Sequence, residues 1–227
     1  CPDAKKTEVI IFAKEPVPAL YKTIAQKYDI TLMPFNLHKD FGPEFHQYHP
    51  SSLRWALIHD YLKKGNKHLD YHRVWLADAR DTWFQHEPFA MLAPDTPGFY
   101  AFKGVEQLYI KNCGWNGGWV KDCFGADELH AIGDNDIICG GVSGGDINSG
   151  MQYLSMMSHL ISGTPLKHKH DAAASASSSA SMDGTYAKIA TRSRFPKCER
   201  NGVDQGVHNV LVHEGTIPHL KIFDHSN

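Results

Sequence analysis

The sequence lacks an excess of charge of either sign. Its 227 residues include 23 lysines and arginines and 25 aspartates and glutamates, a formal net charge of −2. Because these charges are interspersed, no basic face is expected that would bind a phosphate backbone. We therefore expect no nucleic-acid partner.

Long apolar runs are also missing. No run reaches the roughly 18 residues that a membrane-spanning helix requires, so this segment is expected to make no membrane contact. The chain begins at Cys1, without an initiator methionine or a signal-type segment. We expect a part of a longer protein, with any membrane anchor outside this segment.

Cysteines are few, and their spacing is typical of neither a zinc site nor a CxxC redox pair. Cys113 and Cys123 flank a stretch whose glycines let the backbone double back. They form either a local disulfide, in an oxidising compartment, or two buried free thiols. The other cysteines are Cys1, Cys139 and Cys198.

The composition predicts one domain. Hydrophobic residues make up 42% and aromatic residues 11% of the chain, which is enough for one sizeable core over residues 1–227. Residues 171–183, DAAASASSSASMD, have nothing to bury and predict a low-complexity surface loop.

Apolar runs and helical patterns alternate along the first part of the chain. Residues 8–13 form a continuous apolar run, which is typical of a buried parallel strand. Apolar residues four apart predict a helix over residues 19–28, and residues 29–34 predict a second strand. Strand, helix and strand in this order are typical of an α/β fold.

The segment HPSSLRWALIHDYLKKG predicts the next helix, with Ser51 or Ser52 as its N-cap and Gly65 as its stop. A strand over residues 73–77 follows, and Asp78 lies at its carboxyl end. Ligands bind at that edge in open α/β sheets. Asp78 is therefore a candidate site residue.

Three further elements are expected in the second half. Residues 136–142 are apolar, and their glycines indicate a strand that another group approaches closely. Asp146 or Asn148 is expected to cap a helix over residues 150–161. A short helix led by Asp204 follows.

Two acids and one base follow the predicted strand at residues 73–77. A carboxylate at the end of a buried strand loses solvation, which is costly unless a cation or hydrogen bonds compensate. Either Arg80 pairs with Asp78 or Asp81 as a strand-end ion pair, or a divalent cation lies between the acids and an anionic substrate.

The acids and the residues after them resemble the DxD motif of nucleotide-sugar-dependent glycosyltransferases of the GT-A fold. The match is Asp78-Ala79-Arg80-Asp81 with Trp83, Phe84 and Pro88-Phe89, a DxRD…FQ…PF form similar to eukaryotic transferase-like proteins. It has one more residue between the acids than DxD, and a bulge at the strand end would bring both acids to the same side.

Three other segments resemble the family in the same order. Arg54 matches a basic residue on the helix before the motif, Cys139-Gly140-Gly141-Val142 resembles a small-residue stretch, and Asp204-Gln205 with Asn209 resembles a DQ…N motif. The resemblance implies a Rossmann-like α/β fold with a mixed, mainly parallel sheet flanked by helices. It implies donor binding by Arg54, Asp78, Arg80, Gly140 and Gly141, Mn²⁺ or Mg²⁺ on Asp78 and Asp81, and catalytic roles for Asp204 and Gln205.

The resemblance also implies a function. We expect a glycosyltransferase for hexosyl or pentosyl transfer that moves a sugar from a nucleoside diphosphate sugar, a UDP-sugar, to a glycan or glycoprotein acceptor with retention. The expected location is the lumen of the secretory pathway, in the Golgi. Acceptor specificity is expected to lie in the Gly- and Trp-rich segment 112–125 and in the low-complexity loop. The alternatives are a sugar-nucleotide- or glycan-binding domain without turnover and a metal-dependent phosphohydrolase, which the spacing of the acids disfavours.

Overall fold

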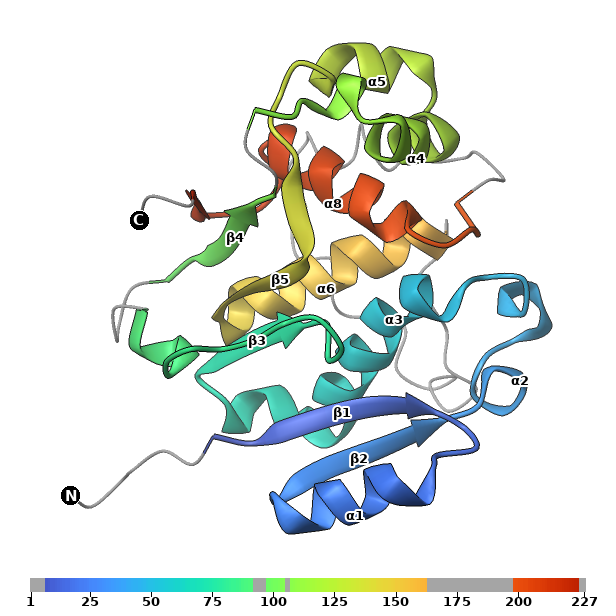
Figure 1. The fold of residues 1–227 in the computed structure, drawn as a ribbon, viewed down its shortest axis with the longest axis vertical. Coiled ribbons are helices and arrows are strands. Elements are labelled where there is room, and N and C mark those ends of the chain that lie inside the picture. The colour runs from blue at the N-terminus through green and yellow to red at the C-terminus, as the bar shows by residue number, and fades with distance from the viewer. Residues whose placement is uncertain (1–6, 92–96, 105–106, 163–197, 225–227) are drawn as a thin grey trace. The chain divides into compact units, whose positions relative to one another are not determined.

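The structure is a computed structural model that describes residues 7–91, 97–104, 107–162 and 198–224. The chain divides into two compact units, Cys1–Gln47 and Tyr48–Asn227 (Figure 1), and each is described by itself. The single domain expected from the sequence stays a prediction. The low-complexity segment at 171–183 lies outside the described residues.

The first unit contains β1 (Val9–Lys14), α1 (Ala19–Lys27), β2 (Ile30–Phe35), α2 (Leu37–Asp40) and a 3₁₀ turn at Pro43–Phe45. β1 and β2 pair in parallel, with Val9 opposite Ile30. A parallel pair needs a crossover connection, which α1 provides. The predicted strand, helix and strand are therefore confirmed.

The second unit contains the strands β3 (Arg73–Ala77), β4 (Phe99–Lys103), β5 (Ile138–Asp146) and β6 (Leu220–Phe223). Their order across the sheet is β3-β5-β4-β6. β5 runs antiparallel to both of its neighbours, whereas β4 and β6 are parallel. The mixed α/β class is confirmed, and the sheet of this unit is mixed, with β3, β4 and β6 running in one direction and β5 against them. Apolar runs report burial of both faces of a strand rather than its direction.

The glycines of β5 allow close packing, as the sequence indicates. A Cβ atom on Gly144 would overlap the ring of Trp75, and one on Gly145 would overlap the backbone at Gly98 and Phe99. At these two glycines, the group that lies close to the strand is therefore part of the protein and not a ligand.

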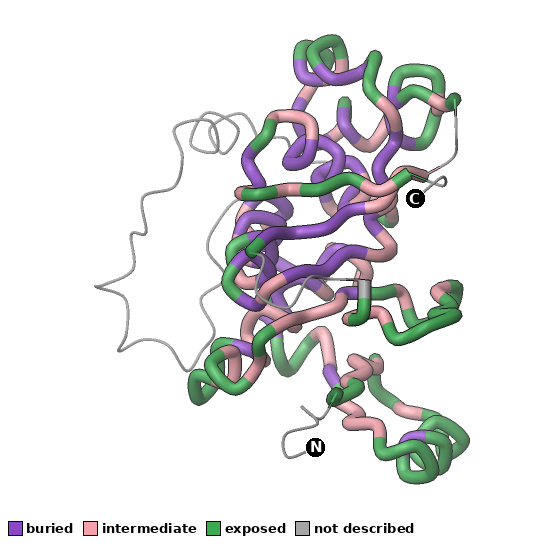
Figure 2. Tube along the Cα trace, turned by 90° about the vertical axis from the view of Figure 1, so that its left-hand side faces the viewer, coloured by how far each residue is buried: buried purple, intermediate pink, exposed green. Residues whose placement is uncertain are grey.

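Helices enclose the core, some packed directly on the sheet and others packed on those helices. They are α3 (Pro50–Lys63), α4 (Gly114–Phe124), α5 (Ala126–Ile132), α6 (Ile147–Ser162) and α8 (Val203–His213), with 3₁₀ turns at Lys64–Asp70, Pro88–Met91 and Ile110–Asn112. α6 and α8 lie against β5, and α3 packs on α6 (Figure 1). The buried segments concentrate where these helices meet the strands (Figure 2), and Trp55, Phe99 and Tyr153 are the largest buried side chains. Within the described ranges, no helix has the length and apolar character needed to cross a membrane.

The start of α3 differs from the prediction. Its N-cap is His49, whose Nδ1 accepts the backbone N–H of Ser51 at 3.3 Å. Pro50 is the first helical residue, a position that proline favours because it has no N–H to leave unpaired. The predicted cap at Ser51 or Ser52 is therefore wrong.

The N-caps of α6 and α8 differ in kind: one is an aspartate and the other a glycine. The Oδ1 atom of Asp146 accepts the backbone N–H groups of Asn148 and Ser149, both at 3.0 Å. Of the two caps that the sequence offered for α6, Asp146 and Asn148, the structure therefore shows Asp146. The N-cap of α8 is Gly202. Asp204 therefore lies inside the first turn of α8 and does not cap it.

A disulfide joins Cys123, in the last turn of α4, to Cys198, in the segment that precedes α8. The two Cα atoms are 4.9 Å apart. The local disulfide between Cys113 and Cys123 is wrong, because about ten helical residues separate these positions by about 15 Å, well beyond disulfide reach. Cys113 and Cys139 are free and half-buried.

We predict that Cys123→Ser combined with Cys198→Ser lowers the free energy of unfolding by about 2–4 kcal/mol, because the bond closes a loop with a sequence separation of 75 residues. Urea denaturation of the wild type and this variant, each with and without dithiothreitol, measures the difference. The reductant should destabilise only the wild type. Recovery of a peptide linking Cys113 to Cys123 by mass spectrometry of the unreduced protein would contradict the pairing.

Candidate functional site

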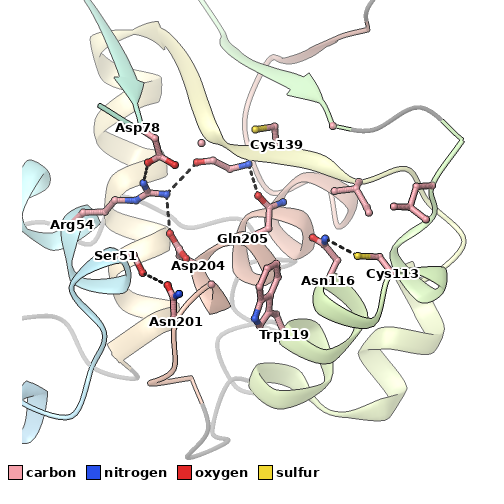
Figure 3. A pocket seen from close by; sticks show the side chains of 16 residues that line it. Ser51, Arg54, Asp78, Cys113, Asn116, Trp119, Cys139, Asn201, Asp204 and Gln205 are labelled. Carbon is pink, nitrogen blue, oxygen red and sulfur yellow. Dashed lines mark hydrogen bonds and ion pairs between the residues drawn. The ribbon is translucent and has the colours of Figure 1, made fainter. Parts of the chain in front are cut away.

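A cavity of about 400 Å³ lies in the second unit, bounded by α3, the end of β3, β5, α4 and the start of α8 (Figure 3). It brings together residues from four segments that the sequence singled out. These are Arg54, Asp78, Gly140, Gly141, Asp204 and Gln205, and the other lining residues are Ser51, Gly104, Leu108, Cys113, Asn116, Trp119, Ile137, Cys139, Asn201 and Gly202.

Arg54 bridges the two carboxylates of the cavity. Its Nη1 donates to Oδ1 of Asp78, and its Nη2 donates to Oδ2 of Asp204 at 2.8 Å (Figure 3). The side chain of Asp204 is only 5% exposed and that of Arg54 is 25% exposed. A carboxylate buried to this extent needs a paired cation. The three side chains together carry a formal charge of −1.

The position of Arg54 follows from the packing of α3. Its neighbours Leu53 and Trp55 are almost fully buried, so this turn of the helix faces the interior. The guanidinium carbon lies 4.4 Å from the centroid of the Trp55 ring, within the range of a cation–π interaction. Trp55 therefore helps to hold the guanidinium between the two acids.

α8 supplies hydrogen bonds to β5 where β3 has ended. β3 stops at Ala77, opposite Val142. Beyond that point, Gln205 accepts the N–H of Gly140 at 2.7 Å and donates to the carbonyl of Ile138 at 2.5 Å. Asn209, one turn further along α8, accepts the N–H of Ile138 at 2.9 Å. The two amides take the place of a neighbouring strand.

This arrangement gives Gln205 a positioning role that the sequence reading did not foresee. Both ends of its carboxamide hold β5, and a Cβ atom on Gly140 would lie 3.0 Å from its Oε1. The carbonyl oxygen keeps a second lone pair and the NH₂ group a second proton. A catalytic role for Gln205 beside a reacting sugar stays a prediction.

The turn after β3 separates the two acids of the motif. It is closed by a hydrogen bond from the N–H of Thr82 to the carbonyl of Asp78 at 3.2 Å. Arg80 and Asp81 are exposed and do not line the cavity. In the described part of the chain, Arg80 pairs with neither acid; the cation on Asp78 is Arg54. The prediction that Arg80 forms the strand-end ion pair is therefore wrong.

A divalent cation on Asp78 and Asp81 stays a prediction. Oδ1 of Asp78 pairs with Arg54, while its Oδ2 faces the bare backbone of Gly141, where a Cβ atom would lie 3.0 Å away. Asp81 is exposed. Mg²⁺ at phosphate-transfer sites is held by one or two carboxylates together with substrate phosphates and water. The described residues contain no group of three or more possible ligands, so the remaining ligands would come from substrate and water.

One wall of the cavity is formed by α4, which lies in the Gly- and Trp-rich segment 112–125 where the sequence places acceptor specificity as a prediction. It contributes Asn116 and Trp119, with Cys113 at the helix start. Asn116 donates from Nδ2 to the sulfur of Cys113 at 3.3 Å. Burial opposes ionisation of Cys113, but hydrogen bonds from Asn116 and the backbone of Trp115 outweigh it, and the pKa of Cys113 is lowered. The only sequence signal was the unusual density of Gly and Trp.

A buried pair lies beside the ion bridge. The hydroxyl of Tyr153 and Nδ1 of His208 are 2.7 Å apart, and both side chains are fully buried. Burial raises the pKa of Tyr153. Burial, with smaller effects of His213 and Arg54, lowers the pKa of His208 to about 3. The pair is therefore neutral at pH 7.

Comparison of the chain with models of known protein families, with curated proteins and with solved structures finds no match. The resemblance to GT-A glycosyltransferases therefore stays a prediction, based on the motifs and on where their residues lie.

We predict that His208 makes the protein less stable as the pH falls below about 6.5. Unfolded histidine takes up a proton below that pH, whereas native His208 stays neutral until about pH 3. Its contribution is thus present above pH 6.5 and lost between pH 6.5 and 3. Between pH 5 and 6, the slope of unfolding free energy against pH should be smaller in His208→Gln by about 1 kcal/mol per pH unit. Equal slopes in urea denaturation would contradict the assignment.

Proposed function

We propose that this protein is a metal-dependent glycosyltransferase of the GT-A type, which moves a sugar from a UDP-sugar to a glycan or glycoprotein acceptor with retention. The observation that carries this proposal is the convergence of Arg54, Asp78, Gly140-Gly141 and Asp204 on one cavity. These residues come from four separate segments of the chain. They are the segments whose order resembles the family.

The charge of the cavity suits this chemistry. In glycosyl transfer, the bond from the sugar to the diphosphate stretches, so the sugar becomes positively charged while negative charge collects on the leaving phosphate. Asp204 is held by Arg54 in a nearly dry position, where a fixed carboxylate stabilises developing positive charge more strongly than in water. Arg54 acts as the positioning residue that keeps Asp204 and Asp78 in place.

The leaving diphosphate requires positive charge. Asp78 and Asp81 would hold a Mn²⁺ or Mg²⁺ ion, which stabilises the negative charge of the leaving group when bound. Arg80, exposed beside them, is the additional cation for the phosphates. The bare backbone of Gly140 and Gly141 leaves room beside Asp78 for the donor.

The disulfide supports the proposed location. Structural disulfides form and persist in oxidising compartments such as the lumen of the secretory pathway. The Cys123–Cys198 bond is therefore consistent with the Golgi lumen, where sugar transfer to glycans would take place.

One observation favours a sugar-nucleotide- or glycan-binding domain without turnover as the second candidate. Both carboxylates of the cavity are paired with Arg54, and both ends of the Gln205 carboxamide are hydrogen-bonded to β5. Such a site would bind ligand with these groups fixed and would need none of them to react.

The experiment that tests the proposal compares Asp204→Asn with the wild type. A panel of sugar nucleotides with Mn²⁺ identifies the donor by the UDP that the wild type releases. With that donor, Asp204→Asn should lower kcat by about 100-fold, the order of loss when one transition-state charge interaction is removed, and leave the KM for donor within about twofold. Asp134→Asn is the matched control, since Asp134 is 77% exposed and lies outside the cavity.

The outcomes separate the two candidates. Wild-type turnover in Asp204→Asn would remove Asp204 from the mechanism. Binding of a sugar nucleotide without release of UDP in the wild type would favour the binding domain.

A further inference from the structure

A serine and a histidine are in contact at the start of α3, beside the cavity. Oγ of Ser51 lies 2.7 Å from Nδ1 of His49. Ser51 is half-buried and lines the cavity, whereas His49 is exposed and does not line it. Ser51 is therefore in reach of an occupant of the cavity, while the ring beside it can exchange protons with solvent.

The hydrogen bonds of His49 determine which ring nitrogen carries the proton. Nδ1 accepts the backbone N–H of Ser51 at 3.3 Å, so this nitrogen has a lone pair and the proton of the neutral ring is on Nε2. The hydroxyl of Ser51 is therefore the donor of the 2.7 Å contact, which is shorter than the capping bond. A hydroxyl that donates to an unprotonated imidazole at this distance has the arrangement of a nucleophile and its general base.

The segment before α8 holds this pair in place. The backbone N–H of His49 donates to the carbonyl of Glu199 at 2.9 Å. The preceding residue is Cys198, whose disulfide ties the segment to α4. Oδ1 of Asn201 lies 3.3 Å from Oγ of Ser51 (Figure 3). The same segment therefore contacts both the histidine and the serine, and the single proton of the hydroxyl has its shorter contact with the histidine.

The other residues of the cavity favour a neutral substrate. Arg54, Asp78 and Asp204 line it with a formal charge of −1, which disfavours an anionic substrate in the absence of a metal ion. Leu108 and Ile137 add apolar surface to the lining. A neutral carboxylic ester suits both features, and its acyl carbon is a group that serine hydroxyls attack.

We propose that Ser51 and His49 form a catalytic pair that hydrolyses neutral carboxylic esters, an activity separate from the proposed sugar transfer. Oγ of Ser51 attacks the acyl carbon, its proton passes to Nδ1 of His49, and the alkoxide leaves with that proton as an alcohol. Water then attacks the acyl carbon and gives one proton to Nδ1, which returns it to Oγ as the carboxylic acid is released. Ser51 lies in the first turn of α3, where the helix dipole stabilises negative charge on the attacked acyl oxygen.

The test uses the full chain, without sugar nucleotide or metal ion. A fluorophosphonate probe should attach one phosphonyl group per chain to Oγ of Ser51 with loss of fluoride, and mass spectrometry of the peptides locates it. In parallel, the wild type should release p-nitrophenol from p-nitrophenyl acetate faster than buffer does. Ser51→Ala should abolish the label and reduce ester hydrolysis to the rate in buffer.

The variant His49→Asn separates the base from the helix cap. Asparagine is among the most favourable N-cap residues, so the Tm should match that of the wild type. Without the imidazole, the rates of labelling and of ester hydrolysis should each fall by about 100-fold, the lower end of the contribution of a general base. His59→Asn is the matched control, because His59 is also on α3 but does not line the cavity, and it should leave both rates unchanged.

The results have distinct meanings. Labelling of Ser51 and ester hydrolysis that both depend on His49 would support the catalytic pair, even where no sugar nucleotide is turned over. A wild type in which Ser51 stays unlabelled, or in which the ester is hydrolysed no faster than in buffer, would overturn it. Equal rates in His49→Asn and the wild type would also overturn it, because Ser51 would then react without this base.

Discussion

The ion bridge of Arg54 is the interaction on which the candidate site depends. It joins α3 to the end of β3 and to α8 through residues that lie 24 and 150 positions away along the chain. Asp204 is too deeply buried to stay charged without a partner. Any loss of the bridge would therefore both destabilise the fold and release the two carboxylates that define the cavity. The same ion bridge therefore supports both the stability of the fold and the geometry of the site.

The cavity exists because the sheet is incomplete at that point. β3 ends at Ala77, opposite Val142, whereas β5 extends four residues further at this edge, to its start at Ile138. Side chains of α8 satisfy this part of the β5 backbone instead of a strand. A side chain occupies less of the edge than a strand would, and glycines leave the backbone bare beside Asp78. The disulfide and the ion pair between Arg200 and Asp122 hold the segment before α8 against α4. The opposite wall of the cavity is thereby kept in place.

Local patterns could be predicted from the sequence, whereas pairings between distant segments could not. Apolar runs and periodicity located β1, α1, β2, α3, β3 and α6, and the position of Asp78 at a strand end was correct. The direction of β5 could not be predicted, because burial of this strand does not reveal whether its neighbours run with it or against it. The partner of Asp78 was sought nearby at Arg80 and is Arg54. The partner of Cys123 was likewise sought within ten residues and is Cys198. Only the folded chain brings such residues together.

The most direct measurement is a double-mutant cycle on the ion bridge, with the free energy of unfolding measured for the wild type, Arg54→Met, Asp204→Asn and the double variant. Arg54→Met alone should lower the free energy of unfolding by about 3 kcal/mol, because it leaves a buried carboxylate unpaired. The effects of the two substitutions should be coupled by about 2 kcal/mol. Losses that add to within about 0.5 kcal/mol, as for distant sites, would contradict the claim that Arg54 holds the site together.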